Sequence, residues 1–117
     1  MNTNKIKIAI PMAEDKLCLH FGHCERFALL DVDLTGRKII RREDAVPPPH
    51  EPGVLPRWLA EQKVEMVMAG GMGQRAQGLL AGQNIRVIVG LSPDTPENII
   101  AQYLDGTLKS GENVCDH

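Results

Sequence analysis

Residues 64–90 constrain the fold most, because they combine two apolar runs with a glycine-rich turn, in the order VEMVMAGGMGQRAQGLLAGQNIRVIVG. The runs 64–69 and 85–89 lack polar alternation, which is typical of strands buried on both faces of a parallel sheet. The GGMG glycines allow a sharp turn and leave backbone amides bare, and residues 74–81 predict a short crossover helix that Gly82 ends. The first turn of such a helix carries unpaired N–H groups and attracts anions.

The flanking segments complete an α/β pattern. Residues 5–11 predict a first strand that ends at its proline, and 26–33 with 37–42 predict a hairpin. Apolar residues at helical spacing predict a helix over 53–63, and a capping residue, a proline and an acid begin another that ends at Gly106. This order predicts an α/β sandwich with a mixed five-stranded sheet and right-handed crossovers.

Length and charge narrow the classes of function. A chain of 117 residues with 43% hydrophobic content predicts a single domain, residues 1–117. A formal net charge of -2 gives no electrostatic reason to expect nucleic acid, and the basic cluster in 37–42 is interpreted as an exposed hairpin face. No stretch resembles a signal peptide or a membrane span, so we expect a soluble cytoplasmic protein. Its three cysteines are then buried thiols or metal ligands rather than disulfides.

Cysteine and histidine gather in two short segments. Two of each lie in the loop after the first strand, and Cys-x-His spacing recurs at the tail: Cys18, His20, His23, Cys24, Cys115 and His117. Thiolates and imidazoles are ligands for copper, zinc or iron. Ligands of α/β sheets bind at the carboxyl ends of parallel strands, so we expect the loop and the GGMG turn to share one sheet edge. His50, in a proline-rich loop, is either a surface residue or a neighbour of this edge.

The same turn has other interpretations. Residues 71–76 fit the dinucleotide fingerprint with alanine in third place, but no acid ends the strand 85–89, where one would hold a ribose. Asp94 is the nearest acid and is better explained as a helix cap. A plain tight turn and an anion cradle of another kind are the alternatives. No catalytic triad or carboxylate pair is evident, so we expect a protein that is not an enzyme.

Four segments together resemble the dinitrogenase iron-molybdenum cofactor biosynthesis family: HFGHCERF at 20–27, EMVMAGGMG at 65–73, the following 74–80, and YLDG at 103–106 through NVCDH at 113–117. The family includes nitrogenase cofactor carriers and an orange protein that holds a molybdenum-copper sulfide cluster. The resemblance implies a ribonuclease H-like three-layer sandwich, with helices on both faces of the sheet and without the nuclease carboxylates. It also implies a carrier or scaffold for a molybdenum-copper sulfide cluster or an iron-molybdenum cofactor precursor, with protein partners in cluster transfer or in a larger complex.

The implied cluster is an anion, so its rim would rest on amides and one cation: Gly71, Met72, Gly73, Gln74 and Arg75. Phe21 and Gly22 are carried over from the family motif as further cluster-binding residues. A copper or iron centre would favour Cys24, His20 or His23 as direct ligands, with Cys18, Cys115 and His117 as further candidates. Two alternatives remain open at this point, a nucleotide-binding or enzymatic domain that uses the GGMGQRA turn, and a partner-binding regulator whose cysteines and histidines are structural.

Overall fold

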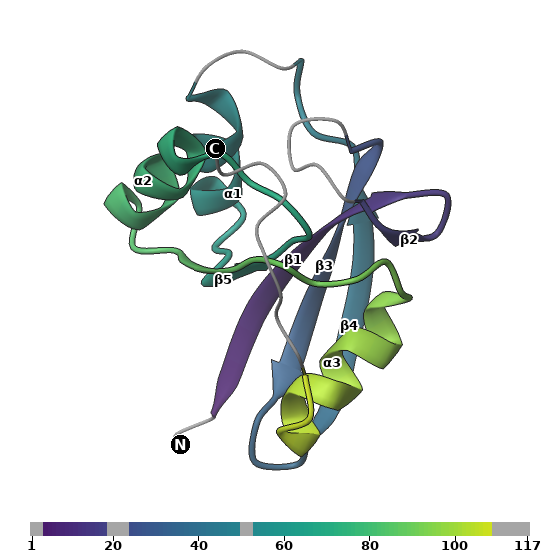
Figure 1. The fold of residues 1–117 in the computed structure, drawn as a ribbon. Coiled ribbons are helices and arrows are strands. Elements are labelled where there is room, and N and C mark those ends of the chain that lie inside the picture. Colours follow the sequence, from purple (N-terminus) through teal and green to yellow (C-terminus); the bar gives the residue numbers. More distant parts are fainter. Residues whose placement is uncertain (1–3, 19–23, 50–52, 109–117) are drawn as a thin grey trace.

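The computed structural model describes residues 4–18, 24–49 and 53–108. It contains a mixed sheet and three helices (Figure 1). The strands are β1 (Lys5–Ala13), β2 (Lys16–Leu17), β3 (Arg26–Asp33), β4 (Lys38–Ala45), β5 (Met66–Met68) and β6 (Arg86–Ile88). The helices are α1 (Val54–Glu61), α2 (Gln74–Gly82) and α3 (Pro96–Asp105). Within these ranges, no helix is both long and apolar enough to cross a membrane.

The sheet has the strand order β4-β3-β1-β5-β6, and β2 pairs with β1 outside this path. β1, β5 and β6 run parallel, whereas β3 pairs antiparallel with β1, and β4 pairs antiparallel with β3. β1 therefore lies in the middle and pairs with β3 along eight residue pairs but with β5 only at Ile8 and Ala9. The predicted mixed α/β sheet is confirmed, and its parallel strands end toward the same edge.

Alternation along β1 divides the buried side chains into two clusters. Ile8 belongs to the first cluster, together with Ile99 and Ile100 of α3. Ala9 belongs to the second, whose helical members are Leu55 and Leu59 of α1 and Leu80 of α2. Figure 1 accordingly shows α1 and α2 together and α3 apart from them. β1 thus lies between two packed layers of side chains.

Two details of the first strand differ from the prediction. The sheet has six strands instead of five, because the chain turns back at Glu14 and Asp15 and adds the two-residue β2. Pro11 does not end β1, which continues to Ala13. Proline lacks an N–H, but β5 does not pair with β1 at this position, and the Pro11 carbonyl still accepts the Cys18 N–H at 2.7 Å.

The strand over 85–89 also differs from the prediction. β5 is buried at all three residues, as expected for an inner strand. In β6, by contrast, Arg86 is exposed and Val87 and Ile88 are only half-buried, because β6 pairs with β5 on one side alone in the described part of the chain. The apolar run is therefore an edge strand rather than a strand buried on both faces.

Arginines of the basic cluster in 37–42 form ion pairs within the protein. The Arg42 guanidinium contacts Asp44 at 2.8 Å and Glu97 of α3 at 2.7 Å. Arg26 joins the same group through Asp44 at 3.1 Å and reaches Asp15 at 2.6 Å. These exposed pairs tie α3 to β4 and to the β1–β2 turn, and each contributes modestly to stability.

Candidate functional site

The glycine turn links the end of β5 to α2 and is fixed against the end of β6. The Ala69 N–H donates to the Ile88 carbonyl at 2.9 Å, and the Gly90 N–H donates to the Gly70 carbonyl at 2.8 Å. Gly70 and Gly71 are buried, and Met72 is only 1% exposed. The turn is therefore part of the packed core up to Met72 and opens only at Gly73.

The glycines of this turn were expected to allow a sharp backbone turn, but none of them adopts the positive φ that only glycine tolerates easily. Positive φ occurs at Gly90 (83°), whereas Gly70, Gly71 and Gly73 are not among the glycines with positive φ. Gly73 has φ -65° and ψ 156°, which any residue adopts. A Cβ atom at Gly73 would meet nothing within 4 Å. The missing side chain thus leaves open space beside the start of α2 instead of permitting a strained turn.

The start of α2 presents backbone amides without a capping side chain. Gly73 is its N-cap residue, no side chain accepts a hydrogen bond there, and the first turn contains no acid. The Gln77 side chain, which the sequence analysis overlooked, donates to the Met72 carbonyl at 2.9 Å and so fixes the turn. The sequence feature that could have indicated this hydrogen bond is a polar side chain five residues after Met72, across the start of the helix. The arrangement can accept an anion, because the free N–H groups and the helix dipole act in the same direction.

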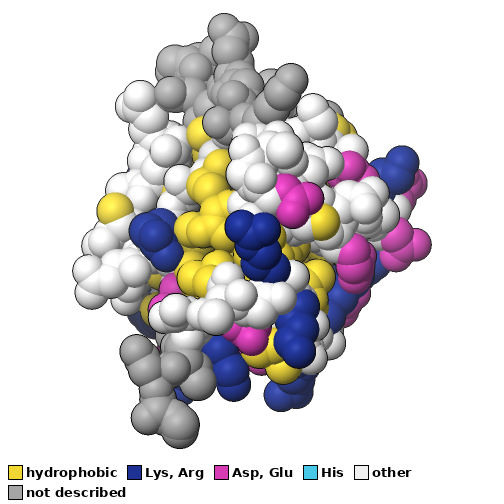
Figure 2. Space-filling model, turned by 90° about the horizontal axis from the view of Figure 1, so that it is seen from below, with side chains coloured by type: hydrophobic (Ala, Val, Ile, Leu, Met, Phe, Trp, Pro, Cys, Tyr) yellow, Lys and Arg dark blue, Asp and Glu magenta, His cyan; other side chains and the backbone are white. Residues whose placement is uncertain are grey.

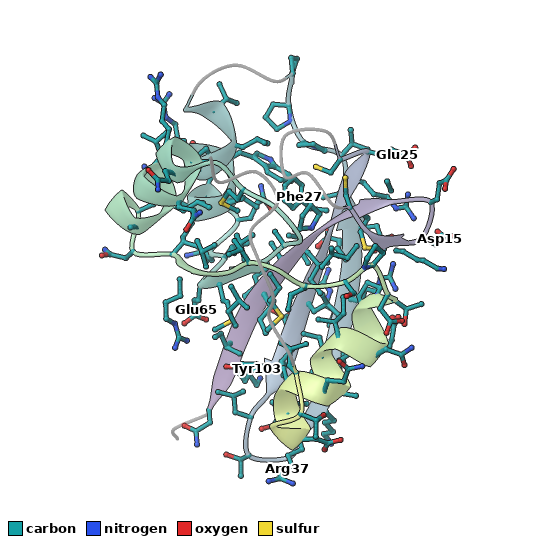
Figure 3. All side chains as sticks on the ribbon, in the orientation of Figure 1. Asp15, Glu25, Phe27, Arg37, Glu65 and Tyr103 are labelled. Atoms are coloured by element: carbon teal, nitrogen blue, oxygen red, sulfur yellow. The ribbon has the colours of Figure 1, made fainter. Side chains whose placement is uncertain are left out.

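The flanks of the cysteine and histidine loop are both attached to the end of β1. The Cys18 N–H donates to the Pro11 carbonyl at 2.7 Å, and the Glu25 N–H donates to the Met12 carbonyl at 2.8 Å. Figure 3 shows Glu25 and Phe27 on this end of the sheet, near α1 and the β1–β2 turn. Cys24 is half-buried and packs against the cluster that contains Met72. The loop flank and the glycine turn therefore lie on the same side of the sheet.

The two described cysteines, Cys18 and Cys24, are half-buried and form no disulfide with each other. Burial, and then the neighbouring Cys18 thiol, raise the pKa of Cys24 from 9.0 to about 12. Cys24 is consequently a neutral thiol at physiological pH, and a metal that ligates it must displace its proton.

The structure describes only part of the predicted site. Cys18, Cys24 and residues 71–75 are described, and Cys24 packs against the cluster that contains Met72. The remaining candidates lie outside the described residues: His20, Phe21, Gly22, His23, His50, Cys115 and His117. In the described ranges no group of three Cys, His, Asp or Glu side chains could hold a metal ion. Two thiols and bare amides suit a soft metal within an anionic group better than a hard cation.

The geometry bears on the nucleotide alternative. The β5-turn-α2 arrangement is the one that the dinucleotide fingerprint requires. However, the Asp94 carboxylate accepts the Thr95 N–H at 2.7 Å and the Asn98 side-chain amide at 3.0 Å. Asp94 therefore stabilises the start of α3, as predicted.

Comparisons with known proteins agree with this geometry. A family model described as dinitrogenase iron-molybdenum cofactor matches residues 4–106. No curated protein matches. The crystal structure of PH0822 is 26% identical, with a TM-score of 0.82 over 90% of this chain and 94% of the other. The apo orange protein from Desulfovibrio gigas is 20% identical, with a TM-score of 0.70 over 92% and 93%. MJ0327 from Methanocaldococcus jannaschii is 17% identical, with a TM-score of 0.71 over 97% and 99%. The chain belongs to the dinitrogenase iron-molybdenum cofactor family.

Proposed function

We propose that this protein binds and carries an anionic metal-sulfur cluster as its cargo, at the edge formed by the glycine turn and the flanks of the 18–24 loop. The cargo is a molybdenum-copper sulfide cluster or an iron-molybdenum cofactor precursor. Family membership and the fold shared with the orange protein support the assignment. We further infer a cytoplasmic, non-enzymatic carrier with the ribonuclease H-like arrangement, in which α1 and α2 cover one face of the sheet and α3 the other, and which hands its cargo to a protein partner.

The observation that carries the proposal is the contrast between α2 and α3. α3 begins with Thr95, whose side chain accepts the Asn98 N–H at 3.3 Å, and has Glu97 in its first turn. α2 has neither a capping side chain nor an acid, and Arg75 stands in its first turn. α1 also begins at an uncapped glycine, so the missing cap alone does not define a site. What distinguishes α2 is the edge where it begins, beside the cluster that holds Cys24.

The donor groups at this edge match a sulfide-bridged cargo. Its negative charge would meet amide N–H groups and the guanidinium of Arg75, which is exposed and makes no ion pair with any described residue. A copper or iron atom in the cargo would suit the Cys18 and Cys24 sulfurs. The protein would thus supply charge complementarity from the turn and soft ligation from the loop.

Anaerobic reconstitution tests the proposal. We expect apo-protein mixed with tetrathiomolybdate and Cu(I) to give a coloured complex that survives desalting, with constant metal per chain by mass spectrometry. Arg75→Glu should weaken binding by about tenfold, because it reverses a charge beside the anion. Arg57→Glu, which changes an exposed arginine of α1, is the matched control and should bind normally. A desalted protein that retains neither colour nor metal would reject the proposal.

The nucleotide alternative is decided in the same samples. The fingerprint geometry at β5 and α2 is the observation that favours it. Titration with nicotinamide and adenine nucleotides, followed by tryptophan fluorescence, should show no saturable binding. Trp58 is a suitable reporter because its ring centroid lies 5.6 Å from that of Phe27, which belongs to the same buried cluster as Met72 of the turn.

A further inference from the structure

Among residues 4–18, 24–49 and 53–108, β6 is paired along one edge and leaves its other edge without a partner strand. The Arg86 N–H donates to the Glu65 carbonyl at 3.0 Å, and the Ile88 carbonyl accepts the Ala69 N–H at 2.9 Å, so both residues use their backbone toward β5. Strand alternation turns the backbone of Val87 to the other side, where no strand from the described ranges pairs with β6. This edge therefore offers a donor and an acceptor to an added strand.

A groove accompanies the open edge. Its volume is about 1000 Å³, and it is lined by Met66 of β5, residues 84–88, Tyr103 of α3, and Gln77, Gly78 and Ala81 of α2. Tyr103 points from α3 toward the sheet (Figure 3). The view from below shows hydrophobic side chains gathered in a band with Lys and Arg at its borders (Figure 2). α3 packs beside β4, and its Tyr103 reaches the groove on the side of β5 and β6.

The charge beside the groove is not neutralised within the described structure. Arg86 is the charged residue among those lining the groove, and it is exposed. The ion pairs of the described residues involve Arg26, Arg41 and Arg42 instead, on the opposite half of the sheet. A bare guanidinium beside an apolar groove favours a carboxylate on whatever fills the groove.

The register specifies the partner further. Arg86 and Ile88 lie two positions apart on one strand, so their side chains project from the same face. A strand paired with β6 would meet Arg86 with an acid and Ile88 with an apolar residue two positions away, because cross-strand neighbours interact directly.

We propose that the β6 edge is a docking site for an extended segment of a partner protein, which carries an acidic and an apolar side chain two residues apart and adds to the sheet as a further strand. Backbone hydrogen bonds to Val87 supply affinity, and Arg86 with the Met66–Ile88–Tyr103 surface supplies selectivity. The Gly90 N–H bond to the Gly70 carbonyl, at 2.8 Å, joins the end of β6 to the glycine turn, so such a partner would lie one strand away from the turn. The docking site does not depend on the cargo that the turn accepts.

Two model peptides test this docking site on the full chain. The probe is acetyl-TETVTV-amide, and the control is the same peptide with lysine in place of glutamate. We expect the acidic peptide to shift the amide NMR signals of residues 86–88 and to slow hydrogen exchange at Val87 by about tenfold at saturation. The lysine peptide should do neither. Arg86→Glu should reverse the preference, so that the lysine peptide binds and the acidic peptide does not. Arg57→Glu on α1 should leave the preference for the acidic peptide unchanged.

Several outcomes would overturn the proposal: binding of neither peptide, equal binding of both, or shifts confined to another surface. Two rival occupants are tested directly. Val87 protection without peptide that is lost on ending the chain after Leu108 would assign the edge to residues 109–117. Protection that is lost on dilution would assign it to a second copy of the chain.

Discussion

The Cys24 thiol should be unusually resistant to alkylation in the folded protein. Its pKa rises from 9.0 to about 12 through burial and, second, through Cys18. At pH 8 the thiolate population is then about a thousandfold lower than in the unfolded chain. The more basic thiolate is a better nucleophile, so the rate per thiolate is about twentyfold higher at a Brønsted coefficient of about 0.45. We therefore expect iodoacetamide to modify folded Cys24 about 50-fold more slowly than unfolded Cys24.

Peptide mass spectrometry of timed samples measures this rate at Cys24 alone. In the folded protein the rate should climb steadily from pH 7 to pH 10, whereas in guanidinium it should level off near pH 9, the ordinary pKa. Cys18→Ser removes the smaller cause and leaves burial, so it should accelerate the reaction only slightly. A folded-state rate that levels off near pH 9, or one equal to the unfolded rate, would refute the argument that burial holds Cys24 protonated.

Three further predictions concern stability in urea. Gly106→Ala should cost about 1 kcal/mol because Gly106 ends α3 with φ 76°, whereas Gly78→Ala inside α2, where a Cβ meets nothing, should gain about 0.5–1 kcal/mol; equal effects would contradict this. Thr95→Ala should cost about 1 kcal/mol and Thr95→Ser much less, since only the first loses the cap. The Asp44 pKa is lowered from 3.8, first by hydrogen bonding to Arg42, so its stabilisation exists above pH 3.8 and is lost as the pH falls through the lower folded value. Asp44→Asn should reduce the loss of unfolding free energy at low pH by less than about 1 kcal/mol. If the urea midpoint of the variant depends on pH between pH 5 and 2 as that of the wild type does, the Asp44–Arg42 pair does not stabilise the fold.

The β5-turn-α2-β6 unit was predictable because each of its parts carries a strong local signal. Apolar runs, a glycine cluster and a helix between them leave little choice of structure. The start of α3 was equally clear, since Thr95, Pro96 and Glu97 form a cap, a first-turn proline and an acid in sequence. β2 was missed because two residues have no measurable periodicity, and its pairing depends on a turn at Glu14 and Asp15 that are both in the left-handed region.

Other properties depend on contacts that no local pattern encodes. The run 85–89 has the composition of an inner strand, but whether a second strand lies beside β6 is a matter of topology. The co-location of the Cys24 flank and the glycine turn followed from the rule that parallel strands end at one edge, and the shared cluster of Cys24 and Met72 agrees with it. The protonation of Cys24 could not be read from the sequence, because it arises from burial in that cluster.

Together these features make the described edge electrically suited to an anion. Cys24 is neutral at physiological pH, and α2 offers amides and Arg75 without any acid in its first turn. The nearest acid in sequence, Glu25, lies 3.6 Å from Arg26 and is therefore partly neutralised. A bare divalent cation would meet no set of three ligands among the described side chains, and its binding would require Cys24 to lose a proton held with a pKa of about 12. An anionic thiometallate does not require Cys24 to lose its proton on first contact. It can bind the backbone amides before either thiol exchanges its proton for a metal. The order of events we infer is therefore electrostatic capture at the turn, followed by ligation at the thiols.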